Sequence, residues 1–225
     1  MTMPKLLNNT QIKYLAAFFM LLDHLALIVL PEQNLIYFFL RSIGRLAAPI
    51  FFWGISEGAW HTKNEKKYLV KILIFALAFQ LIYMQVLWES INLINIFLSY
   101  KNIFFTLALG LAAIIVIKKN PDSNVLMLIS IVLFPILGQI INVDYGWYGV
   151  LTIILFYIFR KDNLKLIIAI ILANAGHFLF NIGKLPLIWN SIQLLSILSL
   201  FIIFLYNGER GKGSKYFFYV FYPAH

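Results

Sequence analysis

Long apolar runs are the feature that most constrains the fold of this chain. Eight of them follow one another, near residues 11–30, 35–60, 68–88, 103–118, 125–141, 144–160, 164–182 and 191–207. A bilayer core about 30 Å thick needs about 20 apolar helical residues, each rising about 1.5 Å. Of the 225 residues, 62% are hydrophobic and 12% are charged, whereas soluble domains are about 45–50% apolar and about 25% charged. The sequence therefore predicts an all-α, polytopic integral membrane helical bundle with eight full spans.

A ninth apolar run begins at Tyr216 and comprises the last ten residues of the sequence, which ends at His225. Ten helical residues cover about 15 Å, which is half of a bilayer. We therefore expect a partial ninth span. Either the natural chain continues and completes it, or the chain ends in a hydrated pocket near His24. A segment lying flat at the cytoplasmic interface is the alternative. Residues 1–225 are accordingly expected to form a single transmembrane domain with an incomplete last span.

The positive charges predict the orientation of the bundle. Fourteen of the 18 Lys and Arg residues precede the first span or fall in every second loop after it. Lys101 and Lys184 fall on the other side, so the positive-inside rule places the N-terminus in the cytoplasm. This pattern accounts for the net charge of +9, and the sequence lacks the continuous basic face expected of a nucleic-acid-binding protein. The chain has no Cys, which excludes disulfides and Cys-ligated metals, and we expect no metal cofactor.

Four ionisable residues lie inside the first two predicted spans: Asp23, His24, Arg41 and Arg45. A charge at bilayer depth costs on the order of 2.5–3.5 kcal/mol, so such groups usually face the bundle and have partners. His24 lies about six residues, or roughly 9 Å, from the outer end of its span, and Arg41 is at a similar depth. Arg45 follows one helical turn later. We expect all four groups to meet at one level and form a functional site. The alternative is an interhelical Asp23–Arg41 pair that stabilises the fold, with His24 a hydrogen-bonded core residue.

The second predicted span contains a proline and a second polar pair. Pro49 frees the carbonyl of Arg45 from its helical hydrogen bond, which predicts a kink at that point. Glu57 and His61 are spaced i,i+4 at the inner end and are candidate binding residues. Next to a lysine-rich loop, they are alternatively an ordinary interfacial pair.

Asn102 and Thr106 open the fourth predicted span, also at i,i+4. A helix N-terminus with polar side chains can bind an anion, so we include both among the candidate binding residues. Asn is also an ordinary N-cap, and that is the alternative.

Several motifs resemble the TraX family over nearly the whole chain. They are Leu22-Asp23-His24, Arg41-Ser-Ile-Gly44-Arg45, Glu57-Gly58-Ala-Trp-His61-Thr62, Asn102-Ile-Phe-Phe-Thr106, Leu205-Tyr206-Asn207-Gly208-Glu209-Arg210-Gly211 and Phe218-Tyr219-Val220-Phe221-Tyr222-Pro223-Ala224-His225. The ordered set is more specific than any single motif.

This resemblance implies a multi-pass acetyltransferase of the bacterial plasma membrane. The family resembles a branch of a transmembrane acyltransferase superfamily in which cytoplasmic acetyl-CoA supplies the acyl group and an intramembrane His is catalytic. Carried over, His24 is the candidate catalytic residue, with Asp23 beside it. Arg41 or Arg45 would stabilise an oxyanion or hold a phosphate of CoA, and His225 would line the same site. The implied acceptor is a pilin or other peptide N-terminus or a cell-envelope glycan.

Two other classes of function use the same residues differently. In a permease or transporter, the buried Asp, His and Arg groups would line a solute or proton path. Transporters commonly contain matching repeats with broken helices, and only the second span here has an internal Arg pair and a Pro. A structural component of a conjugation or secretion apparatus would function without His24.

Overall fold

The computed structural model describes residues 4–32, 34–87, 100–213, 217 and 221, and these are helical apart from short connections. Within them, extended pairing is limited to two isolated bridges, Leu7 with Tyr206 and Lys101 with Val143. The chain divides into two compact units: Met1–Gly54 with Ile167–His225, and Ile55–Leu166. Each unit is described separately below. The expectation of a single domain over residues 1–225 stays a prediction.

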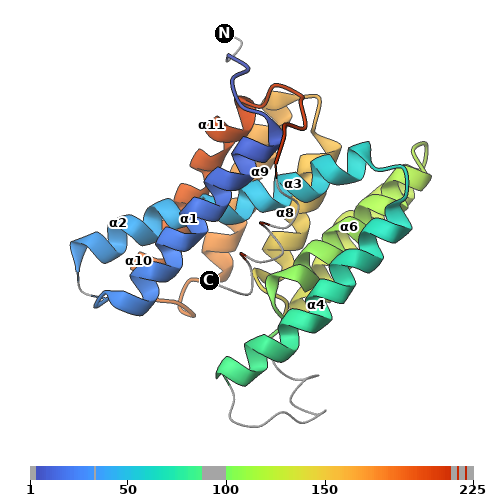
Figure 1. Ribbon diagram of the computed structural model, residues 1–225. Helices are drawn as coiled ribbons and strands as arrows, with labels where there is room; N and C mark the ends of the chain where they lie inside the picture. Colours follow the sequence, from blue (N-terminus) through green and yellow to red (C-terminus); the bar gives the residue numbers. More distant parts are fainter. Residues whose placement is uncertain (1–3, 33, 88–99, 214–216, 218–220, 222–225) are drawn as a thin grey trace. The chain divides into compact units, whose positions relative to one another are not determined.

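The first unit begins with the antiparallel neighbours α1 (Asn9–Val29) and α2 (Leu35–Gly44), which pack along each other (Figure 1). Asn8 starts α1 with a capping box: its side chain accepts from the Gln11 N–H, and Gln11 reaches back to the Asn8 N–H, both at 2.9 Å. Asn34 caps α2 in a similar way, accepting from the Ile36 N–H at 2.8 Å. Both caps satisfy amide donors that the first turn of a helix leaves without backbone partners.

The predicted kink before Pro49 is confirmed, and the helix is interrupted there. Helix α2 ends at Gly44, and α3 (Ala47–His61) begins after a turn at Arg45 and Leu46. The Leu46 N–H donates to the Ile43 carbonyl at 3.1 Å, a tightened last turn. Pro49 has no N–H to donate to the Arg45 carbonyl, and its ring clashes with that carbonyl, which accounts for the interruption.

The first unit is completed by C-terminal helices. These are the later part of α9 (Asn163–Phe180), then α10 (Leu187–Leu194), the 3₁₀ turn η1 (Leu195–Leu198) and α11 (Ser199–Phe204). After α11, the chain bonds to the residues that precede α1. Leu6 and Leu7 donate to the Leu205 carbonyl, and Asn207 donates back to the Leu7 carbonyl at 2.8 Å. The segment after Phe204 therefore anchors the start of α1.

The second unit continues from the end of α3 through α4 (Glu65–Leu87), α6 (Ile103–Lys119), α7 (Asn124–Ile140) and α8 (Gly146–Ile158) to the start of α9. Helix α6 packs against α4, α7 and α8 (Figure 1). Its small residues permit close contact, since a Cβ on Gly110 would lie 2.6 Å from the Ile153 side chain. Ile114, Ile153 and Ile154 are completely buried around this contact.

Each of the eight expected apolar runs is helical, but the expected count of eight full spans and a partial ninth is not reached. Four helical segments in the described part of the chain are long and apolar enough to cross a membrane: Asn9–Val29, Leu35–His61, Asn163–Phe180 and Leu187–Phe204. Helices α7 and α8 have 17 and 13 residues, about 25 and 20 Å, and fall short of a 30 Å core. The partial ninth span lies outside the described residues, apart from Phe217 and Phe221.

Candidate functional site

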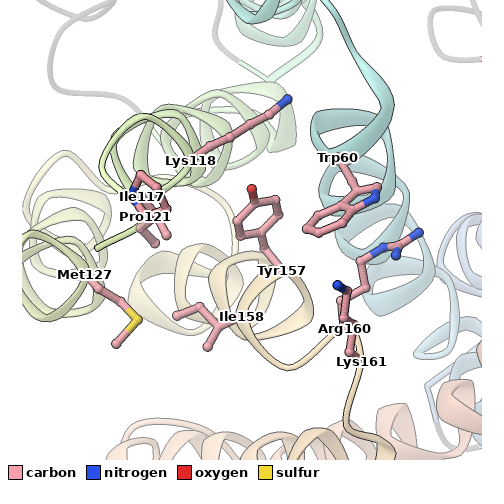
Figure 2. Close-up of a pocket in the computed structure, with 9 residues that line it drawn as sticks. All are labelled: Trp60, Ile117, Lys118, Pro121, Met127, Tyr157, Ile158, Arg160 and Lys161. Atoms are coloured by element: carbon pink, nitrogen blue, oxygen red, sulfur yellow. The ribbon is translucent and has the colours of Figure 1, made fainter. Parts of the chain in front are cut away.

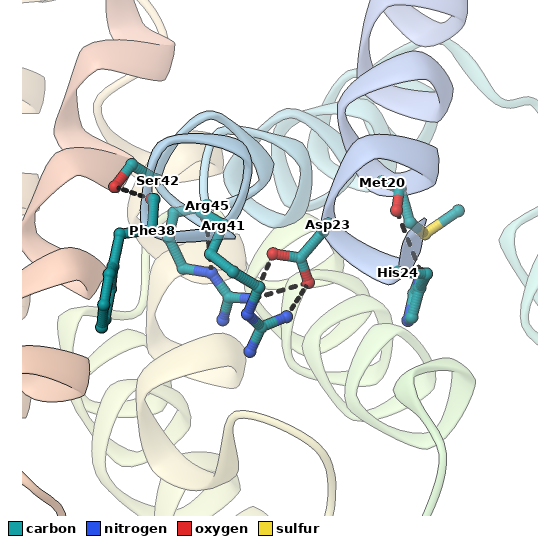
Figure 3. Close-up of polar contacts among 7 residues, drawn as sticks. All are labelled: Met20, Asp23, His24, Phe38, Arg41, Ser42 and Arg45. Atoms are coloured by element: carbon teal, nitrogen blue, oxygen red, sulfur yellow. Dashed lines mark hydrogen bonds and ion pairs between the residues drawn. The ribbon is translucent and has the colours of Figure 1, made fainter. Parts of the chain in front are cut away.

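Asp23 is held by both arginines of the α2 turn. Arg41 Nη1 donates to Asp23 Oδ2 at 2.5 Å, and Arg45 Nη2 lies 2.6 Å from both carboxylate oxygens (Figure 3). Asp23 projects from the middle of α1, while Arg41 lies in the last turn of α2 and Arg45 is its C-cap. The i,i+4 spacing brings both guanidinium groups to one face. The predicted meeting of Asp23 with Arg41 and Arg45 is confirmed.

This cluster carries a net positive charge in a largely buried place. One carboxylate faces two guanidinium groups, and the three side chains are only 12%, 15% and 18% exposed. The Arg41 Nε is buried and has no hydrogen-bond partner among the described residues. The guanidinium also lies 5.7 Å from the ring centre of Trp189 on α10. The cluster therefore retains a buried donor on Arg41 beside the shared carboxylate.

Gly44 gives Asp23 the space to reach the arginines. A Cβ on Gly44 would overlap with the Asp23 carboxylate, so any larger residue at position 44 would displace it. Gly54 is a contrast in the same unit, because its nearest neighbour, the Lys13 side chain, would be 3.5 Å from an added Cβ. The motif glycine at position 44 is thus a packing requirement of the ion pair.

His24 points away from this cluster. Figure 3 shows Asp23 and His24 leaving α1 on different sides, as expected for adjacent helical residues about 100° apart. The His24 Nδ1 lies 3.0 Å from the Met20 carbonyl one turn earlier. A carbonyl can only accept, so Nδ1 carries the proton and the basic lone pair of a neutral ring is on Nε2. The imidazole itself is half-buried, and in this tautomer a neutral ring accepts a proton at Nε2.

Of the four ionisable groups expected at one level, His24 faces another side of α1 from Asp23 (Figure 3). Three of them form the cluster, and the helical rotation between positions 23 and 24 separates the fourth. Arg41 and Arg45 do not lie beside the His24 ring, as stabilisation of an oxyanion formed there would require (Figure 3). Instead, the arginines fix Asp23, and Asp23 fixes the rotation of α1 that sets the direction of His24.

Buried polar atoms without hydrogen bonds also occur in the C-terminal helices of this unit. Asn190 Oδ1, Gln193 Nε2 and Ser199 Oγ have no partner among the described residues. Nearby, Ser196 Oγ donates to Asn174 Oδ1 at 2.8 Å, so part of the same polar face is satisfied. Unsatisfied buried groups of this kind are usually met by water or a polar ligand.

Glu57 and His61 belong to the second unit and meet a third residue there. His61 Nε2 lies 2.9 Å from Glu57 Oε1, as the i,i+4 spacing predicts. Arg160, just after α8, donates to Glu57 through Nε at 2.9 Å and Nη2 at 3.0 Å. The Glu57 side chain is only 4% exposed, and this two-point contact is the strong form of a carboxylate–guanidinium pair.

A cationic, aromatic pocket lies beside this pair in the second unit. Its volume is about 530 Å³, and Figure 2 shows Tyr157 between Trp60 on α3 and the end of α6. Arg160 and Lys161 lie 4.6 and 5.4 Å from the Trp60 ring centre. On the α6 side, Lys118 also contributes to the lining. The pocket combines positive charge with aromatic surface.

Lys118 connects three elements at this pocket. Its ammonium donates to the Ala59 and Thr62 carbonyls at 2.9 and 3.2 Å, where α3 ends. A cation at the C-terminal end of a helix satisfies carbonyls that lack backbone partners. It also pairs with Glu65 at 2.7 Å, and that hydrogen bond lowers the pKa of the Glu65 carboxyl below its ordinary value. Lys118 therefore fixes the wall of the pocket between α3 and α6.

Asn102 and Thr106 have structural partners. Asn102 caps α6 through the Phe104 N–H at 3.0 Å and donates to the Ala76 carbonyl and Gln80 Oε1 on α4. Thr106 Oγ1 donates to the Asp144 carbonyl at 2.5 Å. These contacts favour the N-cap interpretation of Asn102 and join α6 to its neighbours.

The remaining predicted site residue, His225, lies outside the described residues, so its expected approach to His24 stays a prediction.

Sequence reasoning missed Arg160, Lys161, Trp60 and Trp189. The first two were counted only as orientation signals, because they follow an apolar run. The buried carboxyl of Glu57 was the available signal, since a buried carboxylate needs a positively charged partner. Which loop would supply the partner depends on helix packing.

Comparison with known proteins identifies the family. The TraX protein family matches residues 8–225. The chain is 30% identical over 226 aligned positions to a protein named probable fimbrial assembly protein FimC, serogroup H1, from Dichelobacter nodosus; the match covers 96% of this chain and 91% of that protein. No solved structure matches. The ordered motifs, the helical fold and both similarities lead to one conclusion: the chain belongs to the TraX family.

Proposed function

We propose that this protein is an integral-membrane acetyltransferase with His24 as its catalytic residue. The observation that carries the proposal is the hydrogen bond from His24 Nδ1 to the Met20 carbonyl, which leaves the basic lone pair on Nε2. Membership of the TraX family and four helices able to cross a membrane support the same activity. The proposed location is the bacterial plasma membrane, with the N-terminus in the cytoplasm.

The reaction requires a base and a polarised thioester. Acetyl-CoA and an amine give an acetamide and free CoA thiol: a C–N bond forms, the C–S bond breaks, and the amine proton passes to the thiolate. His24 Nε2 takes that proton as the amine attacks and returns it to the leaving thiolate. A neutral imidazole suits this role because its ordinary pKa, about 6.5, is close to neutral pH. Neither step requires a metal ion.

Asp23, Arg41 and Arg45 are positioning residues in this proposal. They join α1 to the end of α2, and the direction of Asp23 determines the direction of the adjacent imidazole. The charge of the cluster and the buried Arg41 Nε also favour an anionic group of a substrate in the same unit.

The proposed acceptor is a peptide amine, namely the N-terminus of a pilin-type protein. The name of the Dichelobacter nodosus relative, a fimbrial assembly protein, supports a peptide in preference to an envelope glycan. A glycan hydroxyl would follow the same chemistry with a C–O bond in place of the C–N bond.

The experiment measures transfer of labelled acetyl from acetyl-CoA by the purified full chain in lipid nanodiscs. Acceptors are a pilin-type N-terminal peptide, the same peptide blocked at its amine, and an envelope glycan. We expect transfer to the free peptide, none to the blocked peptide, and loss of at least about 100-fold in His24→Ala, in line with the 10²–10⁴-fold effect of a general base.

His177→Ala is the matched control, because His177 is also half-buried in a candidate span and contacts Asn181, which directly follows its helix. This variant is expected to retain activity. Full transfer by a folded His24→Ala variant would refute the catalytic assignment. No transfer by the wild-type protein to any acceptor would refute the acetyltransferase function and favour a structural role in assembly.

A further inference from the structure

The pocket formed by Trp60, Tyr157, Lys118, Arg160 and Lys161 has the size of a small-molecule site. Its volume of about 530 Å³ lies within the range of roughly 300–1,000 Å³ typical of ligand pockets. All of its lining residues belong to the second unit, so the pocket is formed within one compact part of the chain. It is separate from the residues that carry the proposed chemistry.

The charges around the pocket favour an anionic ligand. Arg160 and Lys118 are each balanced by a carboxylate, Glu57 and Glu65 respectively. Lys161 adds a further positive charge, with its ammonium 5.4 Å from the centre of the Trp60 ring. The Glu57 contact uses Arg160 Nε and Nη2, so the guanidinium is held rigidly at the pocket wall. A preoriented guanidinium with a neighbouring ammonium is a common arrangement for phosphate recognition.

The aromatic residues favour a flat ring system next to the phosphates. The ring centres of Trp60 and Tyr157 are 5.8 Å apart, and Trp60 is 38% exposed. The apolar side chains Ile117, Pro121 and Met127 complete the opposite wall (Figure 2). Purine bases bind to exposed aromatic side chains by stacking on them.

The same loops carry the charges that the positive-inside rule assigns to the cytoplasm, where nucleotides are present. We infer that this pocket binds the phosphorylated adenosine part of a CoA-type acyl donor. The identity of the donor rests on the proposed acetyltransferase function, whereas the phosphate and purine chemistry rests on the pocket. An anionic lipid headgroup shares the phosphate but has no purine.

The test measures CoA binding to the full chain in phosphatidylcholine nanodiscs by isothermal titration calorimetry. Lys161→Glu is the main variant, because Lys161 is exposed and its replacement leaves the Glu57 and Glu65 ion pairs intact. Lys184→Glu is the matched control: Lys184 is an exposed lysine 3.3 Å from the Phe180 ring centre, on the side expected to face away from the cytoplasm. We expect a rise of at least about tenfold in the Kd for CoA with Lys161→Glu, the effect of losing one charged hydrogen bond, and no change with Lys184→Glu.

Three further ligands separate the sources of phosphate. Pantetheine, which lacks the nucleotide, is expected to bind equally to wild type and Lys161→Glu. Adenosine 3′,5′-bisphosphate is expected to compete with CoA, and dihexanoyl phosphatidylglycerol is expected not to. Competition by the lipid without competition by the bisphosphate would overturn the nucleotide assignment, as would unchanged CoA binding in Lys161→Glu.

The two proposals fail in different ways. If wild type transfers acetyl groups and Lys161→Glu keeps the same KM for acetyl-CoA, the pocket assignment is wrong and the function stands. If CoA binds in a manner sensitive to Lys161→Glu but no acceptor is acetylated, the pocket assignment stands and the transferase proposal is wrong.

Discussion

The ion pairs of Asp23 predict a specific pattern of non-additive stability changes. Because Asp23 has two guanidinium partners at 2.5 and 2.6 Å, either arginine alone still neutralises it. Arg41→Gln and Arg45→Gln are therefore each expected to lower the free energy of unfolding by about 1.5–3 kcal/mol, the value of a charged hydrogen bond. The double variant leaves a carboxylate whose side chain is 12% exposed with neither partner. Losing the last partner of a buried charge costs about 3–5 kcal/mol, so the double variant should exceed the sum of the singles by about 1–2 kcal/mol.

Removal of Asp23 should give the opposite sign of coupling. Asp23→Asn leaves two positive charges beside each other, and adding Arg41→Gln removes one of them. The combination is expected to be less destabilised than the sum of its two single variants. This sign difference distinguishes a charge cluster from three independent packing effects.

The assay is reversible unfolding by SDS in mixed micelles, followed by circular dichroism. Asp162 and Lys165 provide a matched control, since this i,i+3 pair is 3.0 Å apart but 42% and 68% exposed. Surface pairs of this kind contribute little, so Asp162→Asn and Lys165→Gln should be additive. Additive losses in the Asp23, Arg41 and Arg45 series would refute the reasoning.

Three further outcomes are expected. Gly44→Ala should destabilise the protein by about 1–3 kcal/mol in the SDS assay, because the added Cβ overlaps with the Asp23 carboxylate. Gly54→Ala should leave stability unchanged. Equal effects of the two substitutions would contradict the packing argument. Asn102→Ala should lower stability by about 1–2 kcal/mol because the first turn of α6 loses its cap, and unchanged stability in this variant would show that the cap contributes nothing. Glu57→Gln should raise the Kd for anions at the neighbouring pocket by releasing the guanidinium it holds, and tighter anion binding measured by calorimetry would contradict this.

Much of the helical framework follows from the sequence. Apolar runs near membrane length must form helices, because a helix satisfies its backbone hydrogen bonds within one segment. Local rules also place the interruption before Pro49, the cap at Asn102, and the i,i+4 contact between Glu57 and His61. Each of these depends on residues within one or two turns of each other.

The sequence predicted too many full spans, because hydropathy does not mark where a helix ends. The runs around α7 and α8 are mostly apolar, yet α8 begins only at Gly146, after Tyr145 adopts a left-handed conformation at φ 60°. A non-glycine residue rarely adopts this conformation, and it requires tertiary contacts that apolar content does not reveal.

The sequence by itself determined that Asp23 meets the arginines of the next helix, since a buried charge requires a partner and a short connection makes these helices neighbours. Only the tertiary structure decided that Trp189 of α10 lies beside the Arg41 guanidinium. It also decided that Arg160, 103 residues away in the sequence, pairs with Glu57 beside a cationic pocket. Helical periodicity fixes angles within one helix, but the partner of a side chain depends on how separate helices pack, and that packing is a property of the whole fold.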